Sequence, residues 1–463
     1  MMNYSAIVLA AGKGTRMKSN LCKVLHEIAG RPMIYYVLES ARNAGIGKIC
    51  VVVGHQNERV REILKDQNLS FELQEPQLGT GHAVQSAQAS FHGYEGQVLI
   101  LCGDIPLVKS STLKAMMDFH ANIESKLTVM TAAVEDPYGY GRIIRSDEGL
   151  VENIVEERDA DENQRRVREI NAGVYLVDSK ILFDLLSLIK PNNAQGEFYL
   201  TDIVSEANLR GISVHAFQIS DFSEASGINS RADLANVTKK IYESIAHKHM
   251  MDGVTIIDPY TTYIDWGVTI GLDTIIWPGT VFRGVTKLGE RCVIEPHVFI
   301  SNSKIDDEVS ILLGSRLNSA HVSKGASIGP MAHLRPEADV GKNCKVGNFV
   351  EVKKTVLGDG SKASHLTYLG DTVVGRNVNI GCGTITCNYD GKNKHRTLIG
   401  DNCFVGSDVQ FVAPVTVGQG SVIGAGSTIT KNVPDRTLAV TRAKQKIYQL
   451  RLGQGSKSEN ENS

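Results

Sequence analysis

The sequence has no excess of charge of either sign and no long hydrophobic run. Its 463 residues carry 49 lysines and arginines against 51 aspartates and glutamates, a formal net charge of -2. Proteins that bind nucleic acid usually carry a strong basic excess, so we expect no nucleic-acid partner. Apolar runs such as Ile49–Val53 and Val98–Cys102 are far shorter than the roughly 20 residues of a spanning helix, so we expect no membrane insertion.

The sequence also lacks paired cysteines and the features of a secretion signal. Its eight cysteines are scattered and none forms a CxxC pair, so neither a disulfide scaffold nor a zinc ribbon is indicated. Residues 4–10 read as a first strand rather than as part of a signal peptide. These absences predict a cytoplasmic protein with reduced thiols, and the chain length predicts two or more domains.

Up to about residue 229, short apolar runs alternate with stretches of helical periodicity. This alternation is typical of βαβ units around a mostly parallel sheet, and it predicts a Rossmann-like α/β domain over residues 1–229. Open sheets of this kind bind ligands beyond the carboxyl ends of their strands. We therefore expect the chemistry of this half in the loops that follow Leu9 and Leu101.

Residues 230–251 follow the pattern of a single helix. Leu234, Val237 and Ile241 recur at spacings of three and four, and Ser230 is suited to cap the start of the helix. We interpret the segment as a linker between two domains. The alternative, one more surface helix of the first domain, stays open.

From Ile270 onward, large apolar side chains recur every six residues. This period excludes a helical heptad and predicts short flat strands that stack into a left-handed parallel β-helix, an all-β domain over residues 252–463. With three hexads a coil, about nine coils fit between 270 and 434. The recurring residues are Ile270, Ile276, Phe282, Leu288, Ile294, Ile300, Ile328, Leu334, Val340, Val346, Val352, Ile399, Val405, Phe411, Val417, Ile423 and Ile429.

A polar segment interrupts the hexads between Thr386 and Ile399. It reads CNYDGKNKHRT, and insertions of this kind project from one face of a solenoid and often carry binding residues. The tail from Gly453 is poor in apolar residues, so we expect it to be disordered.

A glycine-rich turn follows the first predicted strand. Gly12 and Gly14 let backbone amides approach phosphate oxygens, while Lys13, Arg16 and Lys23 supply positive charge. The spacing differs from that of a Walker A loop, and such a turn alone is nearly as often structural. The accompanying basic residues favour phosphate binding.

Four motifs of the first half resemble those of sugar-phosphate nucleotidyltransferases of the pyrophosphorylase type. They are LAAGKGTRM at 9–17, LCKVLH at 21–26, QLGTGHA at 77–83 and LCGDIP at 101–106. Together with YGRI at 140–143, IVEE at 154–157, EINAG at 169–173 and NNAQGEFYLTDIV at 192–204, they resemble the bacterial bifunctional N-acetylglucosamine-1-phosphate uridylyltransferase and glucosamine-1-phosphate acetyltransferase family over nearly the whole chain. One departure is Cys22, where that family usually has proline, a change expected to loosen the loop that presents Lys23.

The resemblance implies roles for individual residues of the first half. Arg16 and Lys23 would offset the charge of the reacting phosphates, and Asp104 and Asn229 would hold a Mg²⁺ ion, which prefers carboxylate and phosphate oxygens. Without the family, Asp104 reads as either a metal ligand or a turn aspartate. The nucleotide-sugar contacts implied by the family are Leu9, Gly12, Lys23, Gln74, Gln77, Gly79, Thr80, Gly141, Glu156, Asn171, Thr201 and Asn229.

In the second half, polar and charged residues gather around the interrupted hexads. Several cations near one insertion suit a sugar phosphate, and a histidine that titrates near neutrality suits a general base, although a lone histidine is more often structural. By resemblance His365 is the catalytic base, with Glu351 as its expected polarising partner. The family implies glucosamine-1-phosphate contacts at Arg335, Lys353, Tyr368, Asn379, Asn388, Tyr389 and Lys394, and acetyl-CoA contacts at Cys382, Ser407, Ala425 and Arg442.

Cys382 stands where that family usually has alanine, a small change that we expect the site to tolerate. The resemblance further implies a homotrimer whose acetyl-transfer sites are shared between neighbouring β-helices. It also implies the reaction sequence: acetyl-CoA acetylates glucosamine-1-phosphate, and a Mg²⁺-dependent step then joins the product to UMP from UTP, making UDP-N-acetylglucosamine for the cell wall.

Three other interpretations stay open. The β-helix could serve only assembly or regulation of a single-activity nucleotidyltransferase, although this leaves His365 unexplained. It could be a zinc hydratase, but its five histidines, His297, His321, His333, His365 and His395, show no close ligand pair. A non-enzymatic scaffold is disfavoured by the phosphate and metal motifs.

Overall fold

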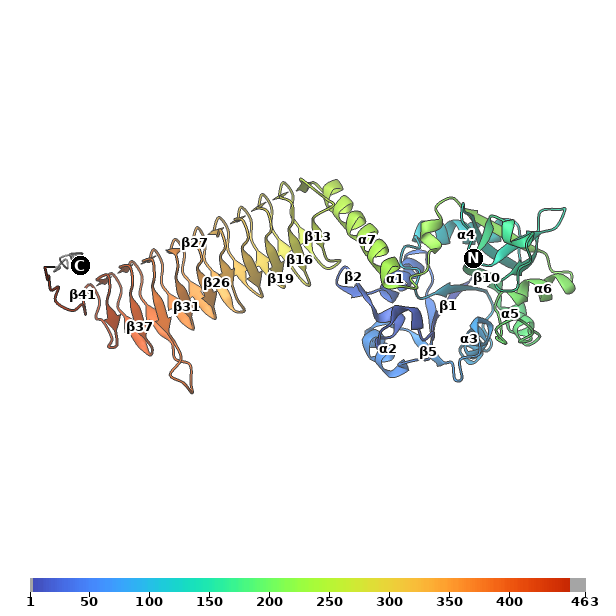
Figure 1. The fold of residues 1–463 in the computed structure, drawn as a ribbon, viewed down its shortest axis with the longest axis horizontal. Helices are drawn as coiled ribbons and strands as arrows, with labels where there is room; N and C mark the ends of the chain where they lie inside the picture. Colours follow the sequence, from blue (N-terminus) through green and yellow to red (C-terminus); the bar gives the residue numbers. More distant parts are fainter. Residues whose placement is uncertain (1–2, 450–463) are drawn as a thin grey trace, which may run out of the picture. The chain divides into compact units, whose positions relative to one another are not determined.

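The computed structural model describes residues 3–449, in two compact units that divide between Ile245 and Ala246 (Figure 1). The tail that the sequence predicts to be disordered, from Gly453 onward, lies outside the described residues. Within residues 3–449, no helix has the length and apolar character needed to cross a bilayer. The eight cysteines are all free thiols.

The first unit is built on a mixed β-sheet in which most strand pairs are parallel. The strand order is β11-β7-β10-β6-β1-β4-β5, and only β10 runs antiparallel to its neighbours on this path. The strands are β1 (Tyr4–Ala10), β4 (Lys48–Val53), β5 (Ser70–Leu73), β6 (Gln97–Cys102), β7 (Leu127–Ala133), β10 (Glu169–Asp178) and β11 (Val214–Ile219), with the hairpin β8 (Arg142–Arg145) and β9 (Val151–Val155) beside β10. The predicted α/β class of this half is confirmed.

Two hydrophobic clusters cover the two faces of the sheet. Alternate residues of β1 enter different clusters, Ala6 and Val8 one and Ile7 the other, because successive strand side chains point to opposite faces. The first cluster takes side chains from α1 (Ile34–Asn43), α2 (Asn57–Leu64) and α4 (Ser110–Asn122), the second from α3 (Thr80–Ser86), α5 (Ser179–Leu186) and α6 (Asp202–Leu209). The unit is therefore a helix–sheet–helix sandwich.

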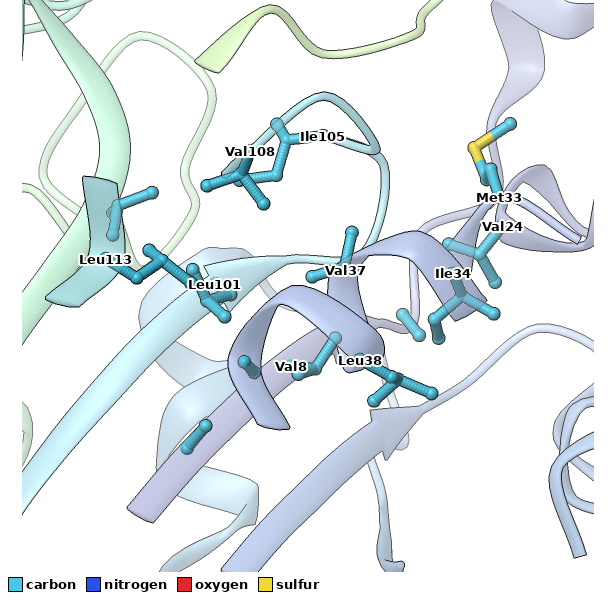
Figure 2. Packing of buried hydrophobic residues seen from close by; sticks show 14 of the residues in the cluster. Val8, Val24, Met33, Ile34, Val37, Leu38, Leu101, Ile105, Val108 and Leu113 are labelled. Carbon is cyan, nitrogen blue, oxygen red and sulfur yellow. The ribbon is translucent and has the colours of Figure 1, made fainter. Parts of the chain in front are cut away.

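The first cluster also anchors two loops at the carboxyl ends of the strands. Figure 2 shows Val24 beside Met33 and Ile34, and Ile105 beside Val108, all in this cluster. Val24 directly follows Lys23 and Ile105 directly follows Asp104. Burial of one residue thus restricts the polar residue next to it.

Helix α7 (Arg231–Met251) begins one residue after the predicted linker helix. Val237 and Ile241 are buried in the first cluster, so the helix contributes to the core of the first unit, which extends past residue 229 to Ile245. Residues 246–251 belong to the second unit. The segment is both a connection and a core helix.

The second unit consists of parallel strands stacked into three sheets of 11, 10 and 9 strands (Figure 1). Each coil contributes one strand to each sheet, beginning with β12 (Thr255–Ile256), β13 (Tyr263–Ile264) and β14 (Thr269–Ile270). Strands β14 to β40 (Thr428–Ile429), three a coil, make nine coils. This arrangement is consistent with the predicted left-handed β-helix, and it begins two strands before the first hexad residue found in the sequence.

The predicted hexad residues fill the interior of the coils. All of them are buried except Ile270, which is half-buried in the first coil. The gap in the sequence pattern after Ile300 is filled by buried Ile305, Ile311, Leu317 and Val322, at steps of five and six residues. A second gap, after Val352, is filled in the same way by Leu357, Ala363, Leu369, Val374 and Ile380.

The predicted interruption lies between β34 (Ile385–Cys387) and β35 (Thr397–Ile399). Tyr389 and Lys394 face each other there in an isolated antiparallel bridge, so the segment is a short excursion from the coil. Asn388 at its base is buried, whereas Tyr389 is exposed.

Candidate active sites

A pocket of about 520 Å³ opens at the carboxyl ends of β1 and β6. Seven of the predicted nucleotide-sugar residues line it, together with the predicted metal ligand Asp104: they are Leu9, Gly12, Lys23, Gln74, Gln77, Gly79 and Thr80. The glycine-rich turn contributes Lys13 and Gly14 to the same wall. The site expected after Leu9 and Leu101 is therefore a real cavity.

Charged side chains meet on one wall of this pocket. The Lys23 ammonium contacts a carboxylate oxygen of Asp104 and donates to Oδ1 of Asn229 at 2.9 Å. Nη2 of Arg16 donates to the same Asn229 oxygen at 2.8 Å. Arg16 and Asn229 do not line the pocket itself, but they join it through Lys23.

Backbone bonds fix the three segments that carry these groups. The Ile228 amide donates to the Asp104 carbonyl oxygen at 3.0 Å, which ties the segment before Asn229 to the end of β6. The Asn229 amide in turn donates to the Asp233 carboxylate at 3.0 Å, at the start of α7. A Cβ added to Gly227 would lie 3.6 Å from Oδ2 of Asp104, in ordinary van der Waals contact, so this segment lies directly beside the acidic group.

Cys22 does not leave the lysine loop unsupported. It is fully buried, its amide donates to Oε1 of Gln56 at 3.0 Å, and its φ of -53° matches the value that proline would impose. The expected loosening is therefore offset by a hydrogen bond that proline cannot make.

Polar side chains also order the opposite wall of the pocket. Nε2 of Gln74, a buried side chain, donates to the Gly79 carbonyl at 2.9 Å, and Nε2 of Gln77 donates to the Ala11 carbonyl. Oγ1 of Thr80 accepts from the Leu200 amide at 3.0 Å. Gln74 thus braces the loop after β5 internally, and Gln77 joins that loop to the loop after β1.

The other four predicted sugar contacts form a second group that does not line the pocket. Glu156 accepts from Oγ1 of Thr201 at 3.4 Å, and the Asn171 amide donates to the Gly141 carbonyl at 2.9 Å. A Cβ at Gly141 would lie 3.4 Å from the Glu156 carboxylate. Burial raises the pKa of Glu156. Thr201 follows Leu200, whose amide binds Thr80, so this group adjoins the pocket.

In the second unit, His365 ends strand β30 (Lys362–His365) at a corner of the coil. Its Nδ1 lies 2.6 Å from Oδ1 of Asn348, the last residue of β27 (Lys345–Asn348). The expected polarising residue, Glu351, instead accepts from Nη1 of Arg335 at 2.7 Å. The predicted His365–Glu351 pair is therefore replaced by a His365–Asn348 pair.

The predicted sugar-phosphate residues gather beside this corner. Tyr368 starts β31 (Tyr368–Gly370) directly above Glu351 of β28 (Glu351–Lys353), and the Asn388 amide donates to Asp371 at 2.5 Å. Lys353 ends β28, and the neighbouring Lys394 ammonium lowers its pKa, as does Arg335 to a smaller extent.

The remaining two sugar-phosphate candidates are Asn379 and Tyr389, of which Tyr389 pairs with Lys394 in the isolated bridge. Asn379 starts β33 (Asn379–Ile380), in the sheet that contains β30, one coil beyond Lys362. The Tyr389 hydroxyl donates a hydrogen bond to the Gly391 carbonyl oxygen at 2.7 Å.

The four predicted acetyl-CoA contacts lie at the same corner of successive coils. The Asp408 amide donates to the Cys382 carbonyl at 2.7 Å, and the Gly426 amide donates to the Ser407 carbonyl at 2.8 Å. Ala425 precedes Gly426, and a Cβ at Gly426 would lie 3.6 Å from the side chain of Arg442. One coil before Cys382, the Gly383 amide donates to the Leu366 carbonyl, so this column begins next to His365.

The zinc interpretation finds no ligand set. In the part of the chain that the structure describes, no three or more histidine, cysteine, aspartate or glutamate side chains are grouped so as to hold a metal ion. His321 lies between Asp306 and Asp339, and His395 bonds Asp390, as surface polar pairs.

Comparisons with known proteins decide the family. The family model "Nucleotidyl transferase" matches residues 5–224, and the model "GMPPB C-terminal domain" matches residues 316–438. The bifunctional protein GlmU of Geotalea uraniireducens is 52% identical over 446 residues, covering 96% of this chain and 98% of that protein. The chain belongs to the bifunctional GlmU family. The GlmU protein of Geobacter sulfurreducens, 52% identical over 463 residues, agrees, covering 96% of this chain and 97% of that protein.

GlmU membership confirms the family predicted from the motifs, and with it an enzyme of the transferase class. Among solved structures, one of UDP-glucose pyrophosphorylase complexed with UDP-glucose matches 53% of this chain and 100% of that chain, with 22% identity and a TM-score of 0.43. The GlmU relatives, by contrast, match along both units.

Sequence reasoning missed two polar residues that line the pocket of the first unit, Glu197 and Cys102, and one residue beside His365 in the second unit, Asn348. Glu197 lines the pocket and lies within the quoted motif NNAQGEFYLTDIV, so the motif contained the signal. Cys102 lines it from the end of β6, and burial raises the pKa of its thiol to about 12, so it is a neutral wall of the site. Asn348, the partner of His365, had no signal, because strand stacking alone brings the two together.

Proposed function

We propose that this GlmU chain makes UDP-N-acetylglucosamine in two steps. The second unit acetylates the amine of glucosamine-1-phosphate with acetyl-CoA. The first unit then transfers UMP from UTP to N-acetylglucosamine-1-phosphate and releases pyrophosphate. One observation carries the proposal: two separate constellations, Lys23–Asp104–Asn229 and His365–Asn348, each lie where the family motifs predict chemistry.

The residues at the first site fit a divalent cation. The Asp104 carboxylate and Oδ1 of Asn229 converge on one cation, the Lys23 ammonium, and oxygen donors of this kind are those that Mg²⁺ prefers. When bound, Mg²⁺ would neutralise developing charge on the phosphates.

The chain's own cations complete the charge balance of uridylyl transfer. Lys23 lines the pocket beside the glycine-rich turn, and Arg16 bonds the same Asn229 oxygen as Lys23. Both can therefore contact the phosphates of UTP and the sugar phosphate. Uridylyl transfer requires little covalent help from the protein, since positioning and charge neutralisation supply most of the catalysis. We expect Gln74 and Gln77 to read the base and Glu156 and Asn171 to contact the sugar.

The second site is suited to a sugar phosphate beside a base. Lys394, and to a smaller extent Arg335, lie close enough to Lys353 to lower the pKa of its ammonium by repulsion between like charges. A phosphate dianion would relieve that repulsion. We place acetyl-CoA along the column of residues from Cys382 to Arg442, with its thioester toward His365.

Single substitutions in the intact chain test the proposal. We expect Asp104→Ala to abolish uridylyl transfer and leave acetyl transfer intact, and His365→Ala to do the reverse, each measured with UTP, acetyl-CoA and both sugar phosphates. A parent chain that transfers UMP but no acetyl group would favour a single-activity nucleotidyltransferase. An unmodified chain inert toward both donors would refute the proposal.

We place the enzyme in the cytoplasm, where UTP and acetyl-CoA are available, as a homotrimer with acetyl-transfer sites shared between subunits. Light scattering measures the mass of the assembly. Mixing inactive His365→Ala chains with chains inactivated at Lys394 should restore acetyl transfer if one site draws on two subunits. A monodisperse monomer with full acetyl transfer would contradict the shared site.

A further inference from the structure

Asn348 contacts His365 through both its backbone and its side chain. The two residues are directly in register at the ends of the parallel strands β27 and β30. The Leu366 amide donates to the Asn348 carbonyl at 3.0 Å, and the two side chains meet at 2.6 Å between Oδ1 and Nδ1. Asn348 is half-buried while His365 is exposed, so the amide is the more constrained partner.

The chemistry of the two groups fixes where the proton lies. A carboxamide oxygen only accepts hydrogen bonds, so the neutral imidazole must donate from Nδ1 to Asn348. Nε2 then keeps its lone pair. The opposite tautomer would place a proton on Nε2 and make the ring useless as a base.

No carboxylate competes for this role among the contacts of the described residues. Glu351, the acidic residue expected to polarise His365, instead accepts from Arg335 at 2.7 Å. A neutral amide orients the ring without adding negative charge beside a site that must accept a sugar phosphate. The orienting partner of His365 is therefore uncharged.

We propose that Asn348 is a positioning residue that holds His365 in the tautomer required of a general base. The inference rests on the proposed acetyl transfer. In that reaction the amine nitrogen attacks the thioester carbonyl carbon, the new C–N bond forms and the C–S bond breaks. Nε2 of His365 takes the proton from the amine and passes it to the departing thiolate of coenzyme A.

Two substitutions at one position test the inference in the full-length protein. We expect Asn348→Ala to lower kcat of acetyl transfer about tenfold or more, with KM for glucosamine-1-phosphate within about twofold, since only the ring orientation is lost. Asn348→Asp keeps the acceptor and should restore most of kcat. Its carboxylate favours the imidazolium, so the acid limb of the pH–kcat profile should move to higher pH.

Asn318→Ala is the matched control. Asn318 also ends a strand, β22 (Arg316–Asn318), and accepts hydrogen bonds from Ser301 and Ser319, outside the acetyl-transfer site. It should leave kcat and the pH profile unchanged. Uridylyl transfer by each preparation, together with its melting temperature, reports whether the chain is folded.

The outcomes separate this inference from the proposed function. Unchanged kcat and pH profile in Asn348→Ala would overturn the positioning role, as would an Asn348→Asp variant no better than Asn348→Ala. ¹⁵N NMR of the histidine ring should show protonated Nδ1 in the parent and a mixture of tautomers in Asn348→Ala. If His365→Ala retains acetyl transfer, the proposed base itself is wrong, whatever Asn348 does.

Discussion

Lys23 occupies the point on which the two proposed metal ligands converge. Its ammonium contacts Asp104 and Asn229, and its side chain and that of Asp104 are only 14% and 20% exposed, so the contact is partly shielded from water. A metal ion at the same oxygens must displace this ammonium. The lysine would then be free to move toward phosphate.

Replacing Lys23 by methionine should therefore tighten divalent-cation binding in the absence of nucleotide. We expect Lys23→Met to bind Mn²⁺ roughly three- to tenfold more tightly, the range of a partly exposed ion pair, while uridylyl transfer falls about 100-fold. Electron paramagnetic resonance of Mn²⁺ measures the affinity. Exposed Lys18→Met serves as the control, and an affinity unchanged by Lys23→Met would show that the ammonium does not compete.

A second residue-scale prediction concerns the buried His120. Burial lowers its pKa to about 4, and the ring contacts Oγ1 of Thr128 at 2.8 Å and Oε1 of Gln97 at 2.9 Å. The unfolded chain takes up this proton near pH 6.5, the native chain only near pH 4. The free energy of unfolding should therefore decrease as pH falls through this window, by about 2 kcal/mol from this group.

Substitution of His120 by glutamine should flatten that pH dependence while costing some stability at pH 7. Denaturant unfolding at pH 7, 5.5 and 4.5 measures it. Equal slopes in the parent and in His120→Gln would contradict the assignment.

At the scale of elements, the β-helix depends on close approach between coils. Gly347 of β27 lies so near the Ser364 carbonyl of the next coil that an added Cβ would overlap it. We expect Gly347→Ala to destabilise the second unit by about 2 kcal/mol or more, because backbone on both sides must shift. It should also lower acetyl transfer, since β27 and β30 carry Asn348 and His365.

Thermal unfolding of Gly347→Ala checks this expectation, with Gly47→Ala as the control because nothing lies within 4 Å of a Cβ there. A melting temperature equal to that of the parent would show that the coils can yield locally.

The hexads also show how far periodicity alone can predict elements. A search for apolar residues exactly six positions apart finds the coils wherever successive interior residues have that spacing. It loses the pattern after Ile300 and after Val352. There the structure has steps of five, such as Ile300 to Ile305 and Val352 to Leu357, with the interior still filled. Buried position, rather than constant spacing, is what the coil requires.

At the scale of the whole molecule, helix α7 decides where the first unit ends. Asp233 accepts from the amides of Asn229 and Ser230, and Val237 and Ile241 complete a core cluster. A fragment of residues 1–245 should keep uridylyl transfer. A fragment of residues 1–229 lacks Val237 and Ile241, so the core surface that they cover becomes exposed. This fragment should be less stable by roughly 3–5 kcal/mol and should bind Mn²⁺ more weakly.

Circular dichroism melts and Mn²⁺ titrations of the two fragments measure these effects. Equal stability and equal affinity would show that α7 serves only as a linker.

The sequence by itself determined the classes of structure and the family. Alternating strands and helices, the hexads and the quoted motifs each involve residues that are close in sequence. They can therefore be recognised without knowledge of the fold. The tertiary structure alone decided the partners of the site residues. Lys23 meets Asn229 across 206 residues, and His365 meets Asn348, 17 residues away, rather than Glu351. Chain folding and coil stacking set those distances, and no periodicity encodes which side chain will be the nearest acceptor.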